Sequence, residues 1–220
     1  MFLSRNISVM ELAVADVARA QGVTDRHVRQ AVSTGALCAL RRVGQTVIID
    51  DLAAQAWGRS RARGRVWTGQ VRAAALEILE HNETRRLSSS ERSRLRSTLR
   101  EMGVSELAHR AGGLGGWWGR YRALRDGQLR GARRMGPSSP ELPRLGLVGV
   151  DPYVTFYEVD SLDEFELDNE VMLDASGELG VVEREPQSGA TRALLDTYLL
   201  GSTRESSAAG AALEAMLRDV

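Results

Sequence analysis

Lysine is absent from this chain of 220 residues, and cysteine is nearly so. All 29 basic residues are arginine, and Cys38 is the single cysteine. One cysteine excludes an internal disulfide framework. The lack of lysine excludes the phosphate-binding loop that needs this residue. The three histidines lie in unrelated contexts, so no zinc-ligand spacing is present and we expect no metal site.

Long apolar runs are also missing. No segment approaches the roughly 20 apolar residues of a membrane span, and the first residues do not resemble a secretory signal. A hydrophobic fraction of 43% and a charged fraction of 26% are ordinary for a folded globular protein. We therefore expect a cytoplasmic protein with two or three modules.

Acidic and basic residues are segregated along the chain. Residues 1–144 hold 25 arginines against 13 acids, whereas residues 145–220 hold 4 arginines against 16 acids. The overall net charge of zero thus conceals a basic part and an acidic part. This asymmetry favours a polyanion as the partner of the first part and a basic partner for the second, or a solvated surface without a partner.

Residues 8–57 carry the most specific pattern. A short helix is expected over Val14–Gln21, followed by a turn at Gly22 and a second helix that Thr24 caps and that ends near Thr34. Two strands around a glycine turn follow, and then a helix that begins at Asp50 or Asp51 and ends at Trp57. This order is that of a helix-turn-helix with a β-hairpin wing.

This module resembles the excisionase-like and MerR-like winged helix-turn-helix families. The matching residues are Gly22-Val23-Thr24, Val28, Gly35-Ala36-Leu37-Cys38-Ala39 and Val43-Gly44. The resemblance implies that the second helix enters the major groove and that the wing contacts phosphate or the minor groove. A basic linker, 58–69, is expected to be flexible and to bind phosphates. The predicted DNA-binding residues are Thr24, Arg26, His27, Arg29, Gln30, Ser33, Arg41, Arg42, Gln45, Thr46, Arg59, Arg61 and Arg63.

Two alternatives stay open for this module. It could be a degenerate winged helix that contacts protein, because a fold alone does not define a function. His27 is more readily interpreted as a polar surface residue than as a reader of bases.

The middle of the chain, 70–135, is expected to be mainly helical. Apolar residues at helical spacing predict one helix over 70–81, and a capping box formed by Ser88 and Glu91 begins another. The glycine-rich run 112–119 lacks the spacing of a nucleotide-binding loop and is interpreted as a loose turn. A proline-rich stretch, 137–143, marks a boundary where the charge changes sign.

Residues 145–220 are expected to form an acidic α+β domain. Strands are predicted over 152–159, 170–173 and 179–183, and helices over 190–200 and 203–218, the last one with a capping box of Ser202 and Glu205. Acidic residues are dense in the intervening loops, and we interpret them as an interaction surface rather than a catalytic or cation site. These residues are Asp160, Asp163, Glu164, Glu166, Asp168 and Glu170.

The order of parts resembles AbiEi-like helix-turn-helix antitoxins, whose genes accompany a nucleotidyltransferase toxin. The resemblance rests on the segment 87–96, on 120–122, which is similar to an R-x-R strand of that family, and on a tail that includes 195–196, 200–205 and 209–213. Ser202-Thr203 departs from the Asp-Pro of that family's tail. The resemblance implies a DNA-binding antitoxin that represses its own operon.

The sequence thus predicts an α+β regulator without catalytic residues, cofactor or metal. We expect it to bind an operator as a homodimer and to engage a cognate toxin. The alternative is a stand-alone regulator or an excisionase-like accessory factor without a toxin. An enzyme that binds a divalent metal at the acidic cluster is the third hypothesis.

Overall fold

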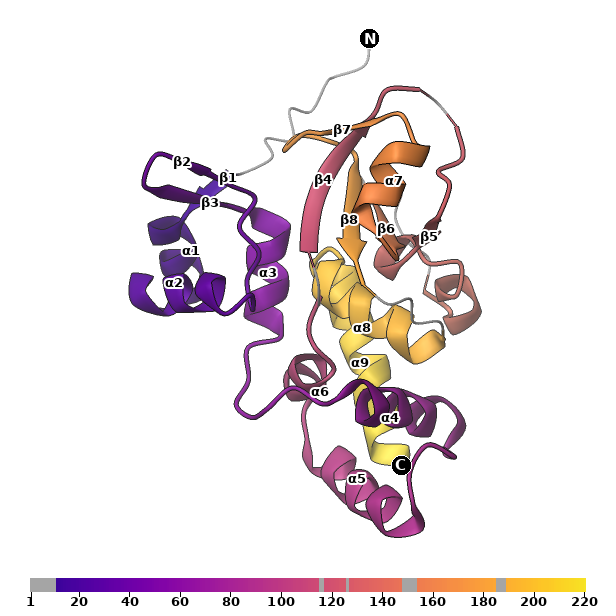
Figure 1. Cartoon of the computed structure of the whole chain (residues 1–220). Helices are drawn as coiled ribbons and strands as arrows, with labels where there is room; N and C mark the ends of the chain where they lie inside the picture. The colour runs from indigo at the N-terminus through magenta and orange to yellow at the C-terminus, as the bar shows by residue number, and fades with distance from the viewer. Residues whose placement is uncertain (1–10, 115–116, 126, 148–153, 185–188) are drawn as a thin grey trace.

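The chain has an α+β fold with two separate β-sheets (Figure 1). The computed structural model describes residues 11–114, 117–125, 127–147, 154–184 and 189–220. The first three residues of the predicted N-terminal module, two glycines of the run 112–119 and the start of the strand predicted at 152 lie outside these ranges.

The N-terminal lobe combines helices with a three-stranded antiparallel sheet of order β1-β3-β2. The predicted helices, turn and hairpin are all present, and β1 is an addition that pairs with β3. Gly22 ends the first helix with a φ of 62°, a left-handed conformation that suits glycine. The elements are β1 (Glu11–Ala13), α1 (Val14–Gln21), α2 (Asp25–Ser33), β2 (Arg41–Val43), β3 (Thr46–Asp50) and α3 (Asp51–Arg59).

Three helices follow: α4 (Gly69–His81), α5 (Ser89–Glu101) and α6 (Val104–Arg110). The predicted capping box forms at the start of α5, where Ser88 and Glu91 each satisfy a backbone N–H of the other. All three helices contact the C-terminal helix α9 (Thr203–Asp219). Helices from the middle and the end of the chain therefore share one helical layer (Figure 1).

The second sheet has five strands in the order β5-β6-β8-β4-β7. Only the β6–β8 pair is parallel, and the other pairs are antiparallel. Helix α7 covers one face, and α8 lies against the other (Figure 1). The elements are β4 (Trp117–Ala123), β5 (Ala132–Arg134), the 3-10 turns η1 (Gly136–Ser138) and η2 (Leu142–Leu145), β6 (Thr155–Val159), α7 (Leu162–Asp168), β7 (Val171–Leu173), β8 (Leu179–Glu183) and α8 (Ala190–Leu200).

Two expectations were wrong for this part. The middle segment is helical only as far as Arg110, because β4 and β5 belong to the same sheet as β6 and β8 and lie before the proline-rich boundary. The acidic stretch is not only loop, since Leu162–Asp168 forms α7, with Ser161 as its N-cap. Burial of Phe165 against Tyr121 of β4 provides the tertiary contact that orders this short helix.

The main hydrophobic core runs without interruption from the N-terminal lobe to α9. A smaller cluster around Tyr121, Val159 and Phe165 fills the space between the sheet and α7. Within the described parts of the chain, no helix is long and apolar enough to cross a membrane. The N-terminal lobe is thus packed onto the rest of the chain through α3, which contacts α8.

Candidate nucleic-acid interface

Helix α2 is held by one apolar side and exposes the other. Thr24 caps its start, and its hydroxyl oxygen accepts a hydrogen bond from the backbone N–H of His27 at 3.3 Å. Val28 and Ala31 are buried against the lobe. Because residues three and four apart share a helix face, the predicted stripe of Arg26, Arg29, Gln30 and Ser33 is exposed on the other side.

Most of this stripe has no partner among the described residues. Across the described ranges, neither hydrogen bond nor ion pair engages the side chains of Arg26, Arg29 and Gln30. Ser33 differs, because its hydroxyl donates to the backbone carbonyl of Gln30 at 2.9 Å. Two guanidinium groups and one amide therefore lie on a single exposed face, where no carboxylate of the described residues neutralises the arginines.

The hairpin β2–β3 adds a second polar surface. Gly44 turns the hairpin with a φ of 59°. Arg42, Gln45 and Thr46 are exposed around this turn, as predicted for a wing. Arg41 is engaged instead, because its Nη2 lies 2.7 Å from a carboxylate oxygen of Glu11 in β1. In Figure 1, α2 and this hairpin lie on the side of the lobe that faces away from the five-stranded sheet.

His27 and Arg61 both contact Trp57 of α3. The His27 ring centroid lies 5.6 Å from that of Trp57, and the Arg61 guanidinium carbon lies 5.9 Å from the centroid of the Trp57 ring. Arg61 also donates to the backbone carbonyl of Gln21 at 3.0 Å. Both residues thus help to pack α2 and α1 on α3. His27 remains exposed, which is consistent with its interpretation as a polar surface residue.

The basic linker is more ordered than we expected. Arg59 ends α3, and its Nη1 donates to the carbonyls of Leu199 and Gly201, each at 2.8 Å. Burial lowers the pKa of this guanidinium. Arg59 is therefore a tether to the end of α8 rather than a free phosphate contact, and the expectation for this residue was wrong.

Further contacts hold the linker against α6. The backbone N–H of Trp67 donates to the carbonyl of Arg110 at 2.9 Å, and the His109 ring contacts the carbonyl of Gly64 at 3.0 Å. Arg63 comes just before these contacts, is exposed, and has no partner among the residues described. These contacts place the linker against α6, and Arg63 remains available to a ligand.

A buried ion pair joins the N-terminal lobe to the sheet. Asp50 caps α3 with Oδ1, while its Oδ2 lies 3.9 Å from Nη1 of Arg120 in β4. Burial raises the pKa of Asp50 to about 6, although the positive charge of Arg120 opposes this shift. The sequence predicted Asp50 or Asp51 only as a cap, because nothing local to residue 50 indicates a partner 70 residues away.

Among the residues that the structure describes, a group of four buried charges was not predicted. Arg184, Arg192, Asp196 and Glu158 form one network below the sheet. Arg192 and Asp196 occupy positions i and i+4 in the otherwise apolar helix α8, and that spacing could have indicated a buried pair.

The predicted acidic surface lies along α7 and the ends of its neighbouring strands. Some of its carboxylates are engaged, since Glu166 accepts a hydrogen bond from the Tyr121 hydroxyl at 2.5 Å and Glu170 pairs with Arg125 at 2.9 Å. Within the described ranges, no three His, Cys, Asp or Glu side chains are grouped as metal ligands.

Comparison of this chain with family models, curated proteins and solved structures finds no match.

Proposed function

We propose that the N-terminal lobe is a winged helix-turn-helix that reads double-stranded DNA, and that the protein is a transcriptional regulator. The observation that carries this proposal is the exposed, unpaired face of α2 that holds Arg26, Arg29 and Gln30. The succession of α1, a tight turn, α2, a hairpin and α3 supports it.

In this proposal α2 enters the major groove. Arginine can pair bidentately with guanine, and glutamine can pair with adenine, so Arg26, Arg29 and Gln30 provide the chemistry of direct readout. Arg42, Gln45 and Thr46 on the wing, together with Arg63, contact the phosphate backbone and position the helix. Arg59 is left out, because it is committed to α8.

The finer proposal is an antitoxin that represses its own operon. It rests on the resemblance of the segments 87–96 and 120–122 and the C-terminal tail to AbiEi-like antitoxins. The acidic part offers a surface for a toxin, since Leu167, Met172 and Leu173 are 86%, 49% and 52% exposed beside the carboxylates of α7. A stand-alone regulator is the alternative.

The experiment is a fluorescence anisotropy titration of the full chain with its own upstream DNA and with a scrambled duplex. We expect the double variant Arg26→Ala/Arg29→Ala to lose most of the preference for the upstream DNA. The matched control is Arg94→Ala/Arg204→Ala, which removes the same charge from exposed positions outside the lobe and should keep that preference.

Equal, weak binding of wild type to both duplexes, unchanged in the double variant, would contradict DNA reading and favour a protein-contact role. The antitoxin role has a separate test, which is co-expression with the product of a neighbouring gene. Relief of that product's toxicity supports it, and the absence of any rescue favours the stand-alone regulator.

A further inference from the structure

A cavity of about 610 Å³ lies at the edge of the five-stranded sheet, far along the chain from α2. It is bounded by β5, by the turn η1 and by the first half of α8. Its volume falls within the range of small-molecule sites. The side chains that matter for its chemistry are Arg133 and Arg134 of β5, Tyr157 of β6, Arg192 and Asp196 of α8, and Gln128.

The carboxylates of this cavity are largely used by the protein. Asp196 accepts hydrogen bonds from Arg184 at 2.5 and 3.0 Å and from Arg192 at 2.6 and 3.2 Å. Glu158 accepts from Arg184 at 2.9 Å. Glu141, which also lines the cavity, pairs with Arg144 at 3.1 Å. Because these carboxylates are engaged by arginines, the cavity offers little to a cationic ligand.

The guanidinium groups retain donors. Arg192 is 3% exposed, and within the described part of the chain its Nη1 has no acceptor. Burial, together with the positive charge of Arg184, lowers the pKa of Arg192. An anion in the cavity could accept a hydrogen bond from this Nη1.

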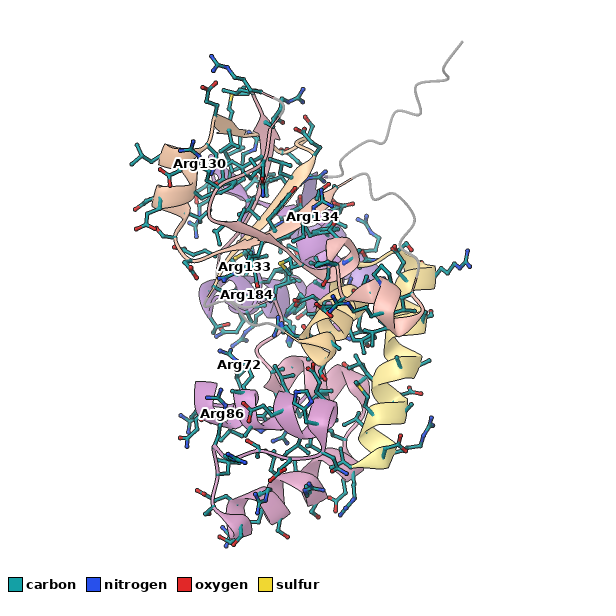
Figure 2. The ribbon with its side chains drawn as sticks, turned by 90° about the vertical axis from the view of Figure 1, so that its right-hand side faces the viewer. Arg72, Arg86, Arg130, Arg133, Arg134 and Arg184 are labelled. Atoms are coloured by element: carbon teal, nitrogen blue, oxygen red, sulfur yellow. The ribbon has the colours of Figure 1, made fainter. Side chains whose placement is uncertain are left out.

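Two further guanidinium groups lie at the rim. Arg133 makes only long contacts, 3.9 Å to Glu158 and 3.4 Å to Asp160, and its side chain is 55% exposed. Arg134 is exposed and has no ion pair with any described residue. Figure 2 shows Arg133 and Arg134 on the same side of the molecule as Arg184, above Arg72 and Arg86.

We infer that this cavity binds a phosphate-bearing small molecule of about mononucleotide size, with its phosphate between Arg133 and Arg192 and with Arg134 at the outer edge of β5. Separate guanidinium groups suit the several oxygens of a phosphate better than the two of a carboxylate. Tyr157 and Gln128 can contact the rest of the molecule. The site is independent of the DNA-reading surface on α2.

The test is calorimetric titration of the full chain with adenosine 5′-monophosphate and with inorganic phosphate. We expect saturable binding of the nucleotide, weaker binding of phosphate, and a loss of about tenfold or more in affinity in Arg133→Gln/Arg134→Gln. Both of these residues are exposed, so the variant should fold, and its thermal unfolding curve checks this. The matched control Arg94→Gln/Arg204→Gln should bind like wild type.

Absence of saturable nucleotide binding at millimolar concentration, or equal loss in both double variants, would overturn the inference. The phosphate could instead come from DNA. In that case Arg133→Gln/Arg134→Gln would weaken duplex binding and the nucleotide would compete with the duplex, which would also overturn a small-molecule site. Because Arg26→Ala/Arg29→Ala should leave nucleotide affinity unchanged, failure of this inference and failure of DNA reading are distinguishable.

Discussion

Asp50 performs two tasks with its two carboxylate oxygens. Oδ1 accepts the backbone N–H groups of Leu52 and Ala53 and so begins α3, whereas Oδ2 faces Arg120 at 3.9 Å without a hydrogen bond. The side chain is 1% exposed, so the charged form loses most of its hydration. The capping role explains why an aspartate occupies position 50, and its burial explains why the ionised carboxylate lowers the stability of the fold.

Asp50→Asn should therefore change how stability depends on pH. The folded-state pKa of Asp50 is raised from 3.8 to about 6, so protonation stabilises the fold, and this stabilisation is lost as the pH rises through 6. The shift corresponds to about 3 kcal/mol. Asparagine keeps the cap without the charge.

The measurement is chemical denaturation of both proteins at pH 5 and pH 7.5. Relative to wild type, Asp50→Asn should gain free energy of unfolding at both pH values, and the gain should be larger at pH 7.5 than at pH 5. Other carboxylates contribute equally to both proteins, so their effects cancel in the comparison. One of them is Asp174, whose pKa is lowered to about 2 by hydrogen bonds from Ser176. Identical pH dependence in both proteins would show that Asp50 is already neutral or well compensated.

At the scale of elements, capping is the physical basis of the best predictions. The boxes at Ser88 and Ser202, and the single caps at Thr24 and Asp50, fix where α5, α9, α2 and α3 begin. Such signals are local, because a side chain bonds a backbone group three residues away, and a sequence displays them directly. The helices that carry them lie within one or two residues of their predicted limits.

The strands that no local pattern indicates, β4 and β5, depend on distant contacts, and only the family resemblance suggested a strand at 120–122. β4 is anchored by pairing with β8 and β7, about 60 residues later in the chain, and β5 has three residues with two adjacent arginines. Neither strand has a long run of alternating apolar and polar residues that would indicate a strand from sequence alone. For the same reason the sequence indicated the exposed face of α2 but not the cavity beside β5, whose walls come from five separate segments.

Helix α8 has a cap that no local pattern reveals. Glu80 of α4 accepts the backbone N–H groups of Ala190 and Thr191 at 3.2 and 3.5 Å. A Cβ at Gly189 would lie 2.5 Å from a carboxylate oxygen of Glu80, so glycine allows this approach. We expect Glu80→Ala to lower the free energy of unfolding by about 1 kcal/mol, since two N-terminal donors lose their acceptor.

The control for this prediction is Glu83→Ala, which removes the same charge from an exposed position without a partner among the described residues. Both variants would be compared with wild type by urea denaturation. Equal effects of the two substitutions would refute the capping role of Glu80.

At the scale of the whole molecule, the N-terminal lobe packs directly against the rest of the chain. Its core is continuous with that of the helical layer, and Arg59 binds the last carbonyls of α8. Because positive charge near a helix C-terminus is favourable, this contact stabilises both partners. The exposed face of α2 therefore belongs to a lobe that is packed against the helical layer.

Arg59→Ala should lower the free energy of unfolding by about 1.5–3 kcal/mol, the usual range for hydrogen bonds to a charged group. Arg63→Ala removes the same charge from an exposed, unpaired position four residues later and should change stability by less than about 0.5 kcal/mol. Thermal and urea unfolding of the two variants gives the comparison. If Arg63→Ala lowered stability as much as Arg59→Ala, the hydrogen bonds of Arg59 to α8 would not be the cause of its effect.

The measurement that tests the central claim most directly is selection of bound duplexes from a randomised DNA pool, with wild type and with Arg29→Ala. If α2 reads bases, wild type enriches a shared sequence, and Arg29→Ala relaxes the preference at one position while the others persist. If wild type enriches no sequence, or if Arg29→Ala enriches the same sequence without change, α2 does not read DNA in the way proposed here.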